Sequence, residues 1–122
     1  MKPNTQKLYE ITVQANDLFI QHNTNISTSV GLMDKALRNK GISADAVTVD
    51  AIVSKNRLIF VLLDTNTEMV GIGLGNITED NIDLVDQIEL NALDPKVATE
   101  FLVKYLTTTI IFKRSTHRLV FK

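Results

Sequence analysis

The sequence predicts one α+β domain in which helices pack against an antiparallel sheet. Residues 57–75 read as a β-hairpin, because the apolar run 58–63 and a second apolar stretch flank a polar turn. Residues 4–23 space their apolar side chains as a helix does, and the Asp-Pro pair at 94–95 is typical of a helix start. We therefore expect two N-terminal helices, an antiparallel meander sheet of three to five strands and one long helix near the C-terminus, in a single domain spanning 1–122.

The composition is that of an ordinary soluble globular protein, with 44% apolar residues, 22% charged residues and a net charge of −1. The lack of cysteine excludes disulfides, a thiolate nucleophile and Cys-based metal sites. The longest apolar run has six residues, whereas a membrane helix needs about 20. The first ten residues also lack the apolar core of a secretion signal. We expect a cytoplasmic protein without a membrane span.

The first expected helix, from about Asn4 to Asn23, has a wider apolar side than a helix resting on one sheet requires. One apolar stripe consists of Leu8, Ile11, Ala15, Leu18, Phe19 and His22. A second stripe consists of Tyr9, Val13 and Ile20. Either a second helix of this chain or another chain must cover it, so these three residues are candidates for partner binding.

A second helix is expected after the polar linker 24–29, which is rich in residues that cap helix N-termini. It would end near Lys40, and its inward side chains would be those of Val30, Met33, Ala36 and Leu37. Gly41 suits the left-handed position after a helix, and Ile42 could then touch Leu37, as in a Schellman motif.

The middle of the chain predicts a three-stranded antiparallel meander from 47 to 75. Alternating apolar residues begin at Val47, and Lys55-Asn56 is a tight turn in which asparagine accepts a positive φ. Residues 82–90 fit either a further strand or a helix capped near Thr78, and their alternation favours the strand.

The long C-terminal helix is expected to begin after Asp94 and to end near 107 or near 113, because no glycine or proline marks the end. The unbroken apolar run 58–63 predicts a strand covered on both faces. The N-terminal helices would cover one face. The C-terminal helix or a second subunit would cover the other, and we expect a homodimer.

Gly71, Gly73 and Gly75 alternate with apolar residues, so a strand would place all three on one face. Their spacing does not match the dinucleotide-binding fingerprint, which needs G-x-G-x-x-G between a strand and a helix. A bare glycine face indicates close packing, a shallow ligand groove or a surface for another chain.

Charge is unevenly distributed, with nine carboxylates and one lysine between residues 64 and 100. The acidic residues Glu79, Asp80, Asp83, Asp86 and Glu89 form either a solvated face or a protein-binding surface, and they do not match the calcium-loop pattern. The C-terminal tail carries Lys113, Arg114 and Arg118 beside aromatic residues. These cations could bind phosphates, but the net charge disfavours a nucleic-acid-binding protein.

No catalytic arrangement is evident in the sequence. His22 and His117 lack metal-ligand spacing, and no serine-nucleophile motif occurs. Asp50 could serve as an acid or base only if its strand face is covered. The sequence thus favours a non-enzymatic binding or regulatory module without a cofactor or metal. The alternatives are a small-molecule-binding domain or small enzyme, and a nucleic-acid-binding accessory protein.

Overall fold

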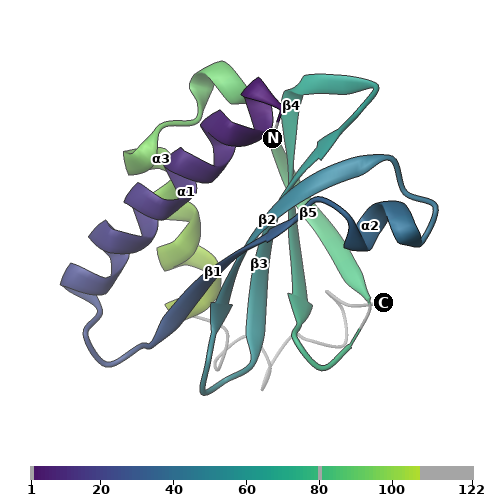
Figure 1. Ribbon diagram of the computed structural model, residues 1–122. Coiled ribbons are helices and arrows are strands. Elements are labelled where there is room, and N and C mark those ends of the chain that lie inside the picture. Colours follow the sequence, from purple (N-terminus) through teal and green to yellow (C-terminus); the bar gives the residue numbers. More distant parts are fainter. Residues whose placement is uncertain (1, 80, 108–122) are drawn as a thin grey trace.

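The computed structural model describes residues 2–79 and 81–107 and shows one long helix, a five-stranded sheet and a short helical segment after the sheet (Figure 1). In chain order the elements are α1 (Pro3–His22), β1 (Thr28–Met33), α2 (Ala36–Asn39), β2 (Ala44–Ala51), β3 (Asn56–Leu63), β4 (Asn66–Asn76), β5 (Ile82–Glu89), η1 (Leu90–Ala92), α3 (Pro95–Leu102) and η2 (Val103–Thr107).

The sheet is an antiparallel meander in which strand order follows chain order from β1 to β5. The predicted meander from 47 to 75 is therefore confirmed as β2, β3 and β4. Residues 82–89 form a strand, as their alternation predicts, rather than a helix. The α+β class and the sheet of up to five strands are likewise confirmed.

The main core lies between the sheet and the layer formed by α1, α3 and η2 (Figure 1). Leu8 and Phe19 of α1 are fully buried against Leu58 and Phe60 of β3. Leu102 of α3 enters the same cluster. Each such aliphatic or aromatic side chain contributes about 1.5–3 kcal/mol when it leaves water, so this layer accounts for most of the hydrophobic stabilisation.

The opposite face of the sheet carries a much smaller cluster, formed by Leu37 of α2 with Ala44, Ala46 and Ile59. α2 covers only part of this face and lies on the side of the sheet away from α1 and α3 (Figure 1). The expectation that the C-terminal helix covers the second face is therefore wrong, because α3 packs beside α1 on the first face.

The prediction of a second N-terminal helix after the linker 24–29 is wrong over residues 30–35. Thr28–Met33 is strand β1, paired with β2, and the helix that follows is a single turn at Ala36–Asn39. The expected end is correct, since Gly41 has φ 85° and Ile42 N–H donates to the Leu37 carbonyl at 2.9 Å. The alternating strand β2 needed a pairing partner, and this requirement outweighed the helical spacing of Val30 and Met33.

The C-terminal helix begins where it is predicted to begin. The Asp94 side chain accepts a hydrogen bond from Val97 N–H at 2.8 Å, with Pro95 in the first turn. The α-helix is nevertheless short and becomes a π-helical segment, η2, at Val103. The predicted end near 113 and the predicted tail residues lie outside the described residues.

Candidate functional site: the open face of the sheet

The face of the sheet that α2 leaves uncovered presents several apolar side chains to solvent. We call Val61, Leu63, Ile82 and Leu84 the apolar platform. Val61 and Ile82 are half-buried, Leu63 is 48% exposed and Leu84 is 70% exposed. Alternation along β3 places Val61 and Leu63 opposite to the buried Phe60, so they lie on the face away from α1. Exposed apolar residues that are contiguous indicate a surface for binding.

The glycine stripe of β4 makes the apolar platform continuous. Gly71 lies between Val61 of β3 and Leu84 of β5, and a Cβ atom at Gly71 would meet the Leu84 side chain at 3.6 Å and the Val61 Cβ at 3.9 Å. At Gly73 the side chains of neighbouring strands approach more closely still. The predicted common face of the three glycines is thus the open face, where side chains from β3 and β5 cross over the bare strand.

An ion pair lies on the same open face, toward the end of the sheet near the β2–β3 turn. Arg57 donates to both carboxylate oxygens of Asp50, from Nε at 2.7 Å and from Nη2 at 2.9 Å. The hydrogen bonds that Arg57 donates to Asp50 raise the pKa of Arg57 above its usual value. The Asp50 carboxylate is therefore engaged by a cross-strand guanidinium, which does not suit the acid–base role that the sequence left open for it.

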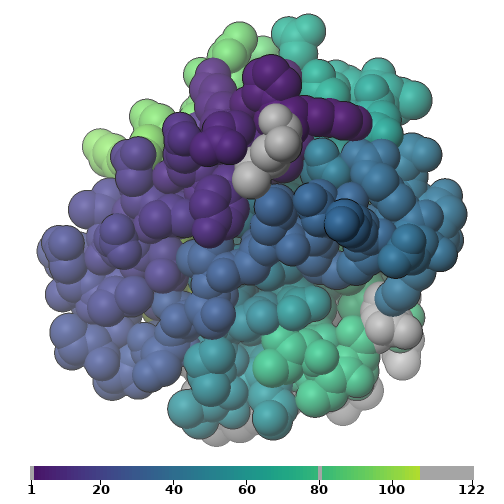
Figure 2. All heavy atoms as spheres, viewed as in Figure 1, coloured from purple at the N-terminus to yellow at the C-terminus, as the bar shows by residue number. Residues whose placement is uncertain are grey.

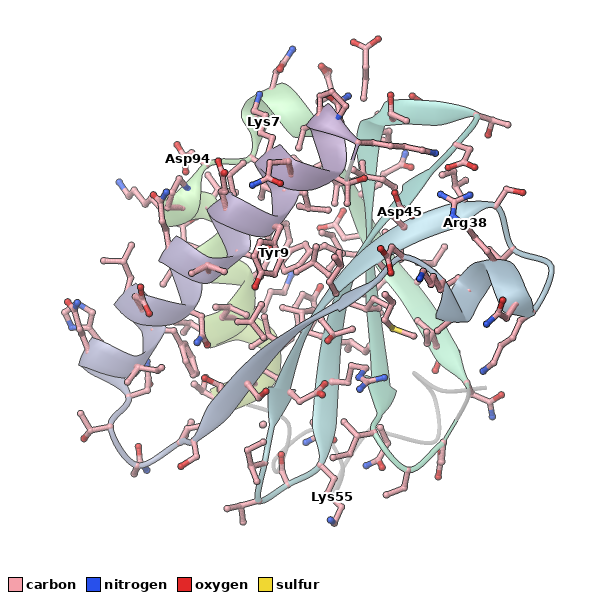
Figure 3. All side chains as sticks on the ribbon, in the orientation of Figure 1. Lys7, Tyr9, Arg38, Asp45, Lys55 and Asp94 are labelled. Carbon is pink, nitrogen blue, oxygen red and sulfur yellow. The ribbon has the colours of Figure 1, made fainter. Side chains whose placement is uncertain are left out.

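A second charged cluster joins α2 to the start of β2 and to the β3–β4 turn (Figure 3). Arg38 donates to Asp45 at 2.8 Å and to both oxygens of Asp64, at 2.6 and 2.9 Å. Asp45 is buried and also accepts a hydrogen bond from Thr5 of α1 at 2.8 Å. Lys2 completes the cluster through Asp64 at 2.9 Å. Every carboxylate in the cluster is thus bound by groups of the chain itself.

These contacts shift the ionisation of both surface partners. The hydrogen bond from Arg38, followed by that from Lys2, holds the pKa of the Asp64 carboxyl well below its usual value. The hydrogen bonds to Asp64 and then to Asp45 raise the pKa of Arg38 above its usual value. Since all of these groups satisfy one another, the cluster fixes α2 in place and is a structural element rather than a binding site.

The structure places the predicted apolar stripe of α1 beside strand β1. Tyr9 and Val13 are half-buried and Ile20 is 39% exposed. Tyr9 points toward β1 in Figure 3, and it packs at the border of the main core. The stripe therefore remains partly accessible, on the flank of α1 that faces the edge of the sheet.

The predicted acidic residues do not converge on one surface. Asp83 and Asp86 are the cross-strand partners of Leu74 and Ile72, whose side chains point toward the main core, whereas Glu89 is opposite Met69. Glu79 follows β4 in a turn. Asp80 and the predicted tail residues Lys113, Arg114 and Arg118 lie outside the described residues.

A hollow of about 270 Å³ lies at the end of the sheet where β1 begins and the β2–β3 turn meets η2. Its walls include Ile26, Val53, Leu106 and Asn56. Asn56 is 7% exposed, and its side-chain nitrogen has no hydrogen-bond partner among the described residues. A buried donor without a partner is costly, and Asn56 is one of the residues that line the hollow.

Sequence reasoning missed the apolar platform and the Arg38 cluster. Leu63 and Leu84 each belong to a strand that the sequence identified, but which of its two faces would stay uncovered depended on where α3 packs. Arg38 falls in the last turn of the helix that the sequence predicts to end near Lys40, and a positive charge at that end has a local explanation. The only signal for its role was the pair of aspartates at the strand ends, Asp45 and Asp64, which become neighbours through the meander.

Within residues 2–79 and 81–107, no three His, Asp or Glu side chains gather as they would around a metal ion. No helix in this part of the chain is long and apolar enough to cross a membrane. Comparisons with protein-family models, with curated proteins and with solved structures give no match.

Proposed function

We propose that this protein is a cytoplasmic, non-enzymatic binding or regulatory module that acts through protein–protein contacts and works as a homodimer. The observation that carries the proposal is the apolar platform. Leu84 and Leu63 expose large side chains on a sheet face that the described part of the chain covers only in part. Because burying each would contribute about 1.5–3 kcal/mol, a partner that covers both gains a substantial part of its binding energy there.

The geometry of the platform fits a protein segment with apolar side chains. The platform is flat, since Gly71 and Gly73 leave no side chains on the strand between Val61 and Leu84. The Asp50–Arg57 pair at one end of the same face offers charged groups at the rim of the contact. An apolar centre with a polar rim is the usual anatomy of a protein–protein interface.

The experiment compares what the wild-type chain and two surface variants retain from native extract. Leu84→Asp replaces the most exposed platform residue, and Leu18→Asp is the matched control, because Leu18 is 37% exposed and lies on α1, on the other side of the sheet from the platform. We expect a protein that wild type and the control retain and that Leu84→Asp loses, and its binding to be reproduced with purified components. Identical retention by all three would contradict the proposal.

The hollow beside Asn56 supports a second candidate, binding of a small molecule with a carbonyl or carboxylate acceptor. A thermal-shift screen of such compounds tests it. A ligand of this site should raise the melting temperature of wild type and of Asp50→Asn, whose altered side chain lies on the opposite face, but not that of Asn56→Ala. A shift that Asn56→Ala retains would place the ligand elsewhere.

A further inference from the structure

Strand β1 is an edge strand whose outer backbone groups are available for pairing. In the part of the chain that the structure describes, its only strand neighbour is β2. Ile52 N–H donates to the Ser27 carbonyl at 2.9 Å. Ser27 and Ile52 are therefore a hydrogen-bonded pair of the antiparallel ladder between β1 and β2. Hydrogen-bonded and non-bonded pairs alternate in an antiparallel ladder. Thr28, Val30 and Leu32 therefore direct their amide and carbonyl groups away from β2.

The two edges of the sheet differ in how they are protected. Strand β5 carries Asp83, Asp86 and Glu89, and its pairing with β4 is interrupted by a register shift. Charges and bulges of this kind keep an edge from pairing with another chain. Strand β1 reads Thr-Ser-Val-Gly-Leu-Met from Thr28 to Met33, with no charge and no proline. Within the described residues, the β1 edge therefore has neither the charges nor the register shift that protect β5.

The α1 stripe extends this edge into a larger surface. Thr28 of β1 donates a hydrogen bond to the Asn16 side chain at 2.6 Å, which places that flank of α1 beside β1. Tyr9 and Val13 lie seven and three residues before Asn16, and Ile20 lies four residues after it. Helical spacing therefore puts all three residues on the same flank of α1 as Asn16. Purple α1 and blue β1 adjoin on the face seen in Figure 2.

We propose that a second copy of this chain docks here, with β1 of each copy pairing antiparallel to the other, so that the two five-stranded sheets become one continuous sheet. This inference rests on the proposed function and names the surface through which the module pairs with itself. If Val30 lies opposite its own copy, Thr28 lies opposite Leu32, so only uncharged residues meet along the strands. The α1 flanks of the two copies then lie side by side.

Self-pairing suits this edge because the two-fold axis of an antiparallel strand pair is perpendicular to the sheet. Such an axis keeps the helices of both copies on one side of the joined sheet. It also places both apolar platforms on the other side, separated by β1, β2 and α2 of each copy. The dimer would therefore present two separate copies of the partner-binding face on one side of the joined sheet.

The test is sedimentation equilibrium of the full chain and of four variants. Val30→Pro removes the outward amide at the centre of β1, while Val30→Ala shortens the side chain but keeps the amide. Ile20→Glu and Leu18→Glu form a second matched pair, because Ile20 and Leu18 are 39% and 37% exposed and lie on opposite flanks of α1. Far-ultraviolet circular dichroism confirms that each variant is folded.

We expect wild type, Val30→Ala and Leu18→Glu to be dimers, and both Val30→Pro and Ile20→Glu to dissociate at least about tenfold more readily. If Val30→Pro fails to fold, the Ile20→Glu and Leu18→Glu pair decides the question. A monomeric wild type, or a dimer that neither Val30→Pro nor Ile20→Glu weakens, overturns the inference. A monomer whose partner binding still depends on Leu84 would overturn this inference and the proposed homodimer, but not the proposed partner-binding role. A β1-dependent dimer with no Leu84-dependent partner would overturn only the partner-binding role.

Discussion

Of the three glycines in β4, Gly73 is the one that side chains of the neighbouring strands approach most closely. A Cβ atom there would lie 2.6 Å from Ile82 Cγ2 and 2.7 Å from Ile59 Cγ2, on both neighbouring strands. At Gly71 the nearest atom would be 3.6 Å away, which is an ordinary contact. We expect Gly73→Ala to lower the free energy of unfolding by about 1–3 kcal/mol, as overpacking does. Gly71→Ala should change it by less than about 0.5 kcal/mol.

Urea denaturation of both variants measures the difference. Equal losses in Gly73→Ala and Gly71→Ala would show that the glycines matter for chain flexibility rather than for the approach of neighbouring side chains. A loss confined to Gly73→Ala would show that the side chains crossing over β4 set the tolerance of this face.

Lys55 holds an uncommon backbone conformation at the β2–β3 turn. Its φ is 65°, and it is the only non-glycine residue among those described with a positive φ. The sequence assigned this conformation to Asn56, but Asn56 begins β3 and pairs with Asn76, so it must be extended. An L-residue in the left-handed region is strained by about 1–2 kcal/mol.

We therefore expect Lys55→Gly to raise the free energy of unfolding by roughly 0.5–1 kcal/mol, because the strain energy that it relieves exceeds the entropic stabilisation that glycine gives to the unfolded chain. Thermal unfolding followed by circular dichroism checks this. Lys40→Gly is not a useful control, because glycine near a helix end has effects of its own. Lys35→Ala, at an exposed position outside the sheet, shows what loss of a lysine charge does alone. A less stable Lys55→Gly would mean that the lysine side chain outweighs the strain.

At the level of elements, the sequence predicted the ends of a helix correctly where one local interaction determines them. Gly41 and the Asp94-Pro95 pair were identified correctly because a left-handed cap and a side-chain cap need only their nearest neighbours. Residues 30–33 were misassigned to a helix, since their apolar spacing also fits a helix. What decides their strand conformation is pairing with β2, a contact between segments about 20 residues apart.

The cap of α3 provides the prediction at this scale. The Asp94 carboxylate accepts from Val97 N–H, and α3 supplies Ala98 and Leu102 to the main core. Asp94→Ala should lower the free energy of unfolding by about 1 kcal/mol, whereas Glu100→Ala, an exposed change in the same helix, should have little effect. Urea denaturation measures both. If the two variants lose stability equally, the cap is not what holds the start of α3.

At the scale of the whole molecule, the prediction that the apolar strand 58–63 is covered on both faces holds only in part. The sequence could not indicate how unequal the two covers would be. α1 and α3 bury Leu58, Phe60 and Leu62 almost completely, while one turn of helix buries Ile59 and leaves Leu63 at 48% exposure. This inequality arises from the packing of α3 beside α1, which no local pattern encodes, and it creates the open face.

The Arg38 cluster joins parts of the molecule that are far apart in sequence, and it predicts how stability depends on pH. Arg38 and Lys2 lower the pKa of Asp64 in the folded protein, so in acid the unfolded chain binds a proton at Asp64 before the folded chain does. The stabilisation from this carboxylate is therefore present above its ordinary pKa of about 4 and is lost as the pH falls toward the lower folded value. The melting temperature of wild type should fall accordingly between about pH 5 and pH 2.5.

Asp64→Asn removes this titration, so its melting temperature should fall less over the same interval, although it starts from a lower value at neutral pH. Asp17→Asn, an exposed change in the middle of α1, is the control and should follow wild type. Because other carboxylates titrate in all three proteins, the difference between the curves isolates Asp64. Parallel curves for wild type and Asp64→Asn would mean that the contacts of Asp64 with Arg38 and Lys2 are screened by solvent, and that hydrogen bonding to the buried Asp45 alone fixes α2 against the sheet.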